Sequence, residues 1–276
     1  MICKLAHRLA LAVALLTATT QVHAANTDSV PTRPVLAMWE AGVGSEHLLD
    51  TYLTPITYVG PMVSLGFEHT QATGFAPQRA MRQLALSVGY GHVKNPVRNN
   101  TMHHLALHAQ WSLTRRWQQA FHPQLELQAG GAAWVHGGVI YNSQNSNNVV
   151  SVKAQAAVAL CARAAFATRL GRYPTIVHLQ ATLPVLGAFF SPDYDESYYE
   201  MYLGNRKHLA HLSWWGNRFD MSTRLATDIH FGGTILRLGY RLGVERSWVR
   251  QLNTHITTHE FVIGIGGEFI TVKRHH

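Results

Sequence analysis

The residues of this sequence that could do chemistry are concentrated in one short acidic tract. SPDYDESYYEMY, residues 191–202, contains four of the 15 Asp and Glu residues in a chain whose formal charge is +8. A His-x-x-His pair, His208 and His211, follows it closely. Carboxylates and imidazoles together can hold a metal ion or act as acid and base in hydrolysis. The same composition is also typical of a solvated loop, so the choice depends on the elements that position the tract.

Most of the chain alternates between large apolar residues and small or polar residues, which predicts β-strands. In QLALSVGY, residues 83–90, the apolar Leu, Val and Tyr positions alternate with Ala, Ser and Gly. The alternating runs reach the ~9–11 residues of a tilted transmembrane strand and exceed the ~5–6 of ordinary strands. We therefore expect an all-β fold, an antiparallel transmembrane β-barrel, rather than a soluble β-sandwich.

The pattern predicts ten strands, with eight or twelve as alternatives. Tight turns are expected at Thr114–Arg116, Leu170–Arg172 and Gly232–Gly233. Longer connections are expected at 94–100, 139–148, 189–216 and 248–256. This alternation of short and long connections is typical of outer-membrane barrels, which have short periplasmic turns and longer outer loops. The expected strands lie near 35–43, 56–70, 79–93, 101–113, 119–138, 149–168, 172–188, 217–231, 234–247 and 257–270.

The N-terminus has the features of a secretory signal peptide. Lys4 and Arg8 precede an apolar run, and Ala24 ends a small-residue cleavage motif. No segment contains the ~20 consecutive apolar residues of a membrane helix, so the expected location is the outer membrane of a Gram-negative bacterium. The expected organisation is a signal peptide over 1–24, an N-terminal extension over 25–34, the barrel over 35–270 and a basic periplasmic tail over 271–276.

Four motifs carry a resemblance to a known family. They are YNSQNSNN at 141–148, SPDYDESYYE at 191–200, TILRLGY at 234–240 and LNTHITTHEFVIGIGGEF at 252–269. With them the chain resembles a family of uncharacterised Bacteroidetes outer-membrane β-barrel proteins that carry a domain of unknown function. The resemblance implies a barrel in the outer membrane, and it supplies no activity and no catalytic residue.

The small or polar parity of each strand is expected to face the barrel lumen. A ten-stranded barrel is too narrow for a wide aqueous channel, because open channels belong to barrels of ~16–18 strands. We expect a lumen plugged by paired carboxylates and basic groups, with a narrow pore as the alternative. The expected polar network consists of Glu68, Glu126, Lys153, Arg224, Asp228, Arg237, Arg241 and Glu268.

An outer-rim hydrolase of protease or lipid-modifying type is a second alternative, although the sequence favours a barrel without enzymatic activity. The weak catalytic candidates are Asp193, Asp195, His208 and His211, and no G-x-S-x-G motif accompanies them. His103 and His104 are adjacent on a strand and point to opposite faces, and the 208/211 pair has no third ligand in a local motif. We therefore expect no metal site and no cofactor.

The acidic tract is expected on the longest outer loop, where it either plugs the barrel mouth or binds an extracellular ligand or protein. A plug would bring its acids toward Arg237 or Arg241. The other expected partners are outer-membrane lipid and the barrel-assembly machinery during insertion, and no nucleic acid is expected. The loop residues expected to bind or to plug are Asp193, Tyr194, Asp195, Glu196, Tyr198, Tyr199 and Glu200.

Overall fold

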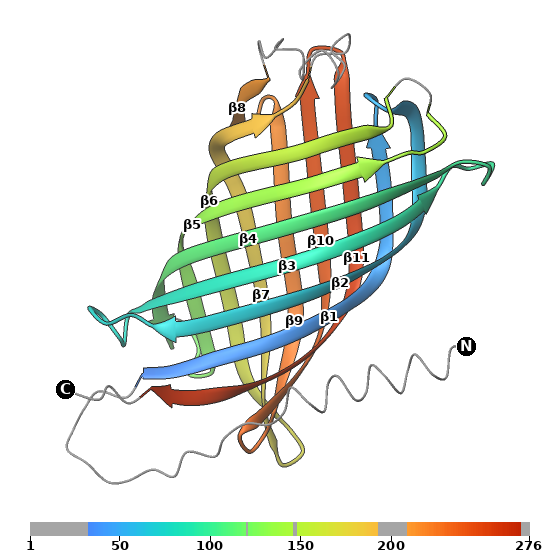
Figure 1. The fold of residues 1–276 in the computed structure, drawn as a ribbon. Coiled ribbons are helices and arrows are strands. Elements are labelled where there is room, and N and C mark those ends of the chain that lie inside the picture. The colour runs from blue at the N-terminus through green and yellow to red at the C-terminus, as the bar shows by residue number, and fades with distance from the viewer. Residues whose placement is uncertain (1–32, 120, 146–147, 193–208, 272–276) are drawn as a thin grey trace, which may run out of the picture. The chain divides into compact units, whose positions relative to one another are not determined.

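Long antiparallel strands form almost all of the described chain (Figure 1). A computed structural model describes residues 33–119, 121–145, 148–192 and 209–271. Within those ranges, no helix is long and apolar enough to cross a lipid bilayer. The strands are β1 (Arg33–Asp50), β2 (Thr54–Ala72), β3 (Ala80–Lys94), β4 (Thr101–Gln118), β5 (Leu125–Tyr141), β6 (Val150–Leu170), β7 (Tyr173–Phe190), β8 (Ala210–Trp214), β9 (Arg218–Phe231), β10 (Thr234–Val249) and β11 (Leu252–Thr271).

Ten of these strands close into one antiparallel barrel. From β1 to β7 and from β9 to β11, each strand pairs with the next strand in the sequence. The first and last strands pair along their full length, from Arg33 opposite Thr271 to Asp50 opposite Thr254. Strand β7 completes the wall because it pairs with β6 on one side and with β9 on the other. The predicted ten-stranded barrel is therefore confirmed.

Strand β8 is a short additional segment of the wall. It pairs with residues 186–190 of β7, whereas β9 pairs with residues 175–182 of the same strand. The two segments therefore occupy successive stretches of one edge of β7 (Figure 1). The count of ten holds because β8 adds no new position around the barrel.

Several connections differ in position or length from those predicted. The predicted turn at Thr114–Arg116 is wrong, because these residues lie inside β4 and the chain turns at 119–124. The predicted long connection at 248–256 is also wrong, because a two-residue turn joins β10 to β11 and places Arg250 at φ 51°. The tight turns at 171–172 and 232–233 lie where they were predicted.

The missed end of β1 has a physical cause. Strand β1 was expected over 35–43 and continues to Asp50, although outward positions such as His47 are polar. Backbone pairing continues there, since His47 pairs with Thr257 and Leu49 with His255. Apolar alternation marks only the stretch of strand that faces an apolar environment, whereas the ladder of backbone hydrogen bonds runs farther.

The outer surface of the barrel carries the large apolar side chains. Leu65, Leu238 and Ile263 are 63%, 45% and 60% exposed, and the residues on the other parity of these strands face inward. A soluble domain would bury such residues, whereas a transmembrane barrel turns them toward lipid. Six tryptophans are also exposed, namely Trp39, Trp111, Trp117, Trp214, Trp215 and Trp248.

Candidate functional site in the barrel lumen

Arg237 on β10 is the centre of a group of buried charges in the lumen. Its side chain is fully buried, and its Nε and Nη2 atoms donate to the two carboxylate oxygens of Asp228 at 2.7 and 2.8 Å. Its Nη1 atom donates to Glu40 at 2.7 Å and to Glu68 at 3.0 Å. Burying a guanidinium group is tolerable only when carboxylates compensate the lost hydration.

Two further arginines extend this group. Arg224 on β9 donates to Glu40 at 2.8 Å, to Glu68 at 2.5 Å and to Gln180 at 3.0 Å. Because β9 and β1 are not neighbours in the sheet, its contact with Glu40 crosses the lumen. Arg241 also donates to Glu40. We call the set the central ion network: Arg224, Arg237, Arg241, Glu40, Glu68, Asp228 and Glu260.

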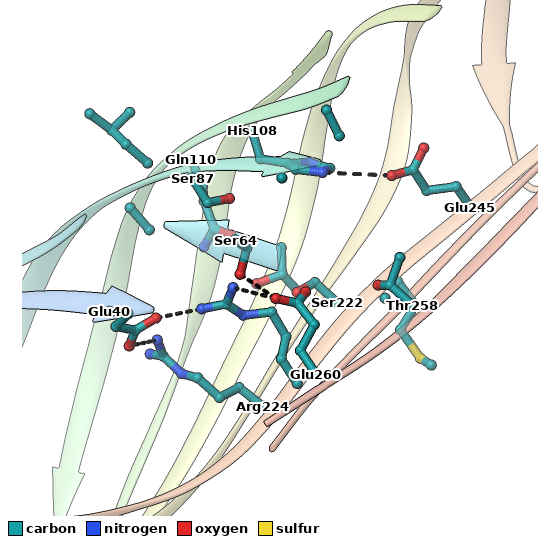
Figure 2. A pocket seen from close by; sticks show the side chains of 18 of the residues that line it. Glu40, Ser64, Ser87, His108, Gln110, Ser222, Arg224, Glu245, Thr258 and Glu260 are labelled. Atoms are coloured by element: carbon teal, nitrogen blue, oxygen red, sulfur yellow. Dashed lines mark hydrogen bonds and ion pairs between the residues drawn. The ribbon is translucent and has the colours of Figure 1, made fainter. Parts of the chain in front are cut away.

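A glycine on β1 leaves room for this network. A Cβ atom at Gly42 would lie 2.4 Å from Ser64 Oγ and 2.5 Å from the Oε2 atom of Glu260. Ser64 donates to that same Glu260 oxygen, so the missing side chain makes space for a hydrogen bond within the lumen (Figure 2). The small residues of the inward parity thus permit large charged residues opposite them.

An apolar cluster fills the lumen beside the connection between β1 and β2. Asn145 fixes this connection, because its Nδ2 atom donates to the backbone oxygen of Leu53 at 2.6 Å. Beside the cluster, Lys153 makes an ion pair of 2.9 Å with Asp50. The apolar cluster consists of Leu48, Tyr52, Leu53, Tyr58, Val93, Met102, Ile140, Leu252 and Ile256.

A cavity of ≈ 140 Å³ borders both the central ion network and the apolar cluster (Figure 2). Its lining includes Glu40 and Arg224 of the network and Ile256 of the cluster. Two buried donors in the lining, Trp134 Nε1 and Gln110 Nε2, have no hydrogen-bond partner among the described residues. Buried donors normally bind a polar group, so the cavity suits a small polar occupant.

The structure brings together five of the eight residues expected in the lumen network. Glu126 lies apart, paired with Arg116 at 2.6 Å near the 119–124 connection. Lys153 belongs to the region of the apolar cluster, and Glu268 is exposed and lines a different recess, of ≈ 440 Å³. The five that meet are Glu68, Arg224, Asp228, Arg237 and Arg241.

Most of the predicted outer-loop site lies outside the described residues. This applies to the catalytic candidates Asp193, Asp195 and His208, and to every loop residue expected to bind or to plug. His211 is described, and its Nε2 atom lies 3.1 Å from the backbone oxygen of Ser191. The two arginines that the loop acids were expected to approach already have carboxylate partners on the barrel strands.

Sequence reasoning missed several residues of the lumen. Glu40 and Glu260 stand at inward positions of predicted strands, so strand parity alone could have indicated them. His108 and His136 are cross-strand partners on β4 and β5. The incorrect turn at 114–116 shifted the expected register of this hairpin and concealed the pair.

The strand pairing and the buried charges define a class of protein: a closed transmembrane-type β-barrel with a charged and largely filled lumen. The family can be stated more narrowly, because the model of the family described as "Protein of unknown function (DUF3316)" matches residues 8–276. The chain belongs to this family. No curated protein matches the sequence.

Several solved bacterial β-barrel structures align with this chain at low sequence identity and low TM-score. Neisserial surface protein A is 8% identical with a TM-score of 0.33, over 84% of this chain and 97% of its own. The β domain of the Bordetella autotransporter BrkA is 9% identical with a TM-score of 0.39, over 85% and 99%. The transport unit of the Escherichia coli autotransporter AIDA-I is 8% identical with a TM-score of 0.38, over 94% and 97%. At these values the barrel assignment rests on the strand pairing of the chain itself.

Proposed function

We propose that the protein is an outer-membrane β-barrel of a Gram-negative bacterium whose lumen is closed, and that it acts as a structural or ligand-binding barrel rather than as an open pore. Two observations support this location: the apolar belt, by which we mean the exposed large apolar side chains of the outer surface such as Leu65, Leu238 and Ile263, and the signal-like residues 1–24. Lipid then covers the outer face, and the barrel-assembly machinery inserts the chain. The Bacteroidetes source that the resemblance implies stays a prediction.

The central ion network carries this proposal. Arg237 is fully buried, and its carboxylate partners come from β1, β2 and β9, so the contacts span the lumen. An ion that passed through would have to separate these pairs, and an uncompensated buried charge costs about 3–5 kcal/mol. The apolar cluster forms a second obstacle in the same lumen.

The cavity supports binding of a small polar ligand or ion inside the barrel. Its ≈ 140 Å³ lies below the ~300–1,000 Å³ of typical pockets for organic ligands. The carboxylates, imidazoles and unpaired donors in its lining favour a compact polar occupant. Extracellular recognition by residues 193–200 stays a separate prediction, since it concerns residues outside the described ranges.

Conductance in planar lipid bilayers tests the closed lumen. The mature protein, refolded and inserted, should give no steady current, whereas a 16–18-stranded porin in the same bilayer should conduct. The double variant R224S/E68S removes one positive and one negative charge from the network and should raise the current. The matched control R116S/E126S removes the pair near the 119–124 connection and should not. A steady wild-type conductance would contradict the closed lumen.

The narrow-pore alternative has one supporting observation. The recess of ≈ 440 Å³ and the cavity of ≈ 140 Å³ both border the central ion network, through Asp228 and Arg224 respectively. A steady, small and ion-selective current in the wild type would favour this alternative. The rim hydrolase stays a prediction, tested by an activity screen on peptides and lipids.

A further inference from the structure

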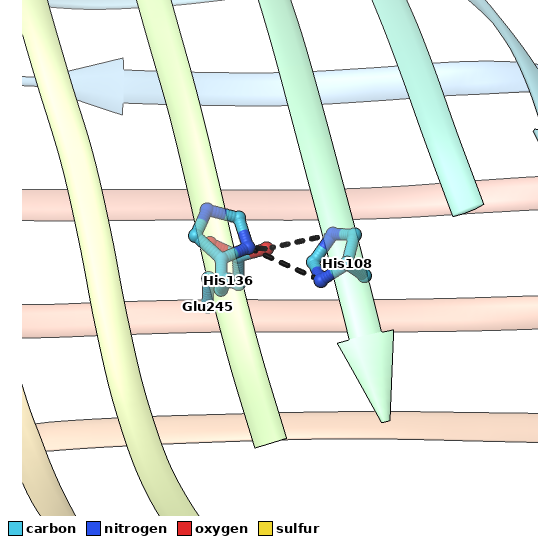
Figure 3. Close-up of side chains that lie close together, drawn as sticks. All are labelled: His108, His136 and Glu245. Carbon is cyan, nitrogen blue, oxygen red and sulfur yellow. Dashed lines mark hydrogen bonds and ion pairs between the residues drawn. The ribbon is translucent and has the colours of Figure 1, made fainter. Parts of the chain in front are cut away.

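Two histidines and one glutamate converge on the lumen from opposite sides of the barrel. His108 on β4 and His136 on β5 are cross-strand partners, and Glu245 belongs to β10, which is not a neighbour of either strand. Figure 3 shows the two imidazoles side by side with the carboxylate reaching toward them. His136 Nδ1 lies 3.1 Å from His108 Nδ1 and 3.3 Å from Glu245 Oε1.

The third contact is longer, since His108 Nε2 lies 3.7 Å from Glu245 Oε1, and the three separations are close to those between the ligand atoms of a divalent transition metal. Tetrahedral zinc has bonds of ~2.0–2.2 Å to imidazole nitrogen and carboxylate oxygen, which places neighbouring donors roughly 3.3 Å apart. One donor atom from each of the three residues lies within 4.8 Å of the other two. Two imidazoles and one carboxylate are also a donor set that suits zinc and its neighbours in the first transition row.

The surroundings hold the carboxylate in position and leave one side open. Arg218 approaches Glu245 Oε2 at 3.8 Å, so the other oxygen, Oε1, faces the imidazoles. Arg218 itself is bound to Asp220 at 2.7 Å. His108 and Glu245 line the cavity of ≈ 140 Å³, which provides space for water as a fourth ligand. The buried His136 Nε2 has no partner among the described residues.

We propose that His108, His136 and Glu245 form a binding site for one divalent transition-metal ion, of the Zn²⁺ or Co²⁺ class, inside the barrel. This inference rests on the proposed closed lumen in one respect, because the ion would occupy the same cavity. No metal site was expected from the sequence, because His108 and His136 meet only when the turn after β4 is placed correctly and Glu245 joins them only across the closed barrel.

Metal titration of the refolded mature protein, without a histidine tag, tests the site. The probes are ZnCl₂ in calorimetry and CoCl₂ in visible absorption, where four-coordinate Co²⁺ has intense bands. The wild type should bind one ion per chain at this site. H136Q and E245Q should each weaken binding by at least about tenfold, since even loss of a residue that only supports a ligand costs ~10–100-fold.

H103Q is the matched control, because His103 lies on the same strand β4 and contacts Tyr90 rather than the lumen residues. It should bind the metal as the wild type does. Each variant must also show the heat-dependent gel shift of a folded barrel. The variant E245K gives a second test of the site, since a lysine amine can occupy it and exclude the ion. Wild-type protein that binds neither ion, or binding equal in H136Q, E245Q and H103Q, would overturn the proposal. Conductance is recorded separately, so an open lumen and a missing metal site remain distinct results.

Discussion

Arg237 and Asp228 face each other as cross-strand partners on β10 and β9, joined by two parallel hydrogen bonds of 2.7 and 2.8 Å. This bidentate pairing of a guanidinium group with a carboxylate fixes both side chains in one geometry. Arg237 still has a donor for Glu40 and Glu68, so this pair anchors the rest of the central ion network. The proposed closure of the lumen depends on this pair.

Replacing Arg237 with Met should destabilise the barrel strongly. Asp228, Glu40 and Glu68 would lose a shared partner, and breaking a buried pair costs about 3–5 kcal/mol. Unfolding by guanidinium in lipid vesicles, followed by tryptophan fluorescence, gives the free energy of unfolding. Arg116→Met, at the partly exposed pair with Glu126, should cost at most about 1 kcal/mol. Similar losses for both variants would show that the network contributes no special stability.

A charge introduced on the outer face tests whether lipid covers that face. Leu238 is 45% exposed and pairs with Ile263 on the apolar belt, so Leu238→Arg should cost about 2–4 kcal/mol in a bilayer. Gln180→Ala, inside the lumen, removes hydrogen bonds to Arg224 and Gln83 and should cost about 1 kcal/mol. Folding equilibria in vesicles measure both, and equal costs would argue against lipid on the outer face.

Deleting residues 193–208 should leave the barrel closed. The central ion network and the apolar cluster both lie in the described strands and turns, so they remain after the deletion. If the acidic tract were instead the plug of the barrel mouth, which was one of the two expectations from the sequence, shortening the loop would open a conductance. Bilayer recordings decide between these expectations, with a folded-barrel gel shift as the control, and new current steps in the deletion variant would identify the loop as the plug.

Gly44→Ala should destabilise the barrel, because a Cβ atom there would lie 1.7 Å from the backbone oxygen of His259. Backbone cannot move as easily as a side chain, and such overpacking costs about 1–3 kcal/mol. Gly137→Ala is the control, since a Cβ there meets no atom within 4 Å. It should be neutral or slightly stabilising. Unfolding midpoints that fall equally would contradict the close approach of β1 and β11 at Gly44.

The alternation of residue types predicted the faces of the strands, and the length of the alternating runs, with the order of short and long connections, predicted the fold class. Leu65 and Leu238 face outward and Glu68 and Arg237 face inward because successive side chains on a strand point to opposite sides. The runs and connections together predicted ten barrel strands, with eight or twelve as alternatives. The alternation could not give the strand ends, because polar outward residues such as His47 continue the backbone ladder beyond the apolar stretch.

Only the tertiary structure decided which inward residues meet. The register of a hairpin depends on where the chain turns. Because the turn after β4 lies at 119–124 rather than at 114–116, His108 lies opposite His136. Contacts across the lumen, such as Arg224 with Glu40 or Glu245 with His136, join strands that are not neighbours in the sheet. Their distances follow from closing the sheet into a barrel, and local sequence patterns contain no information about separations across that closed circumference.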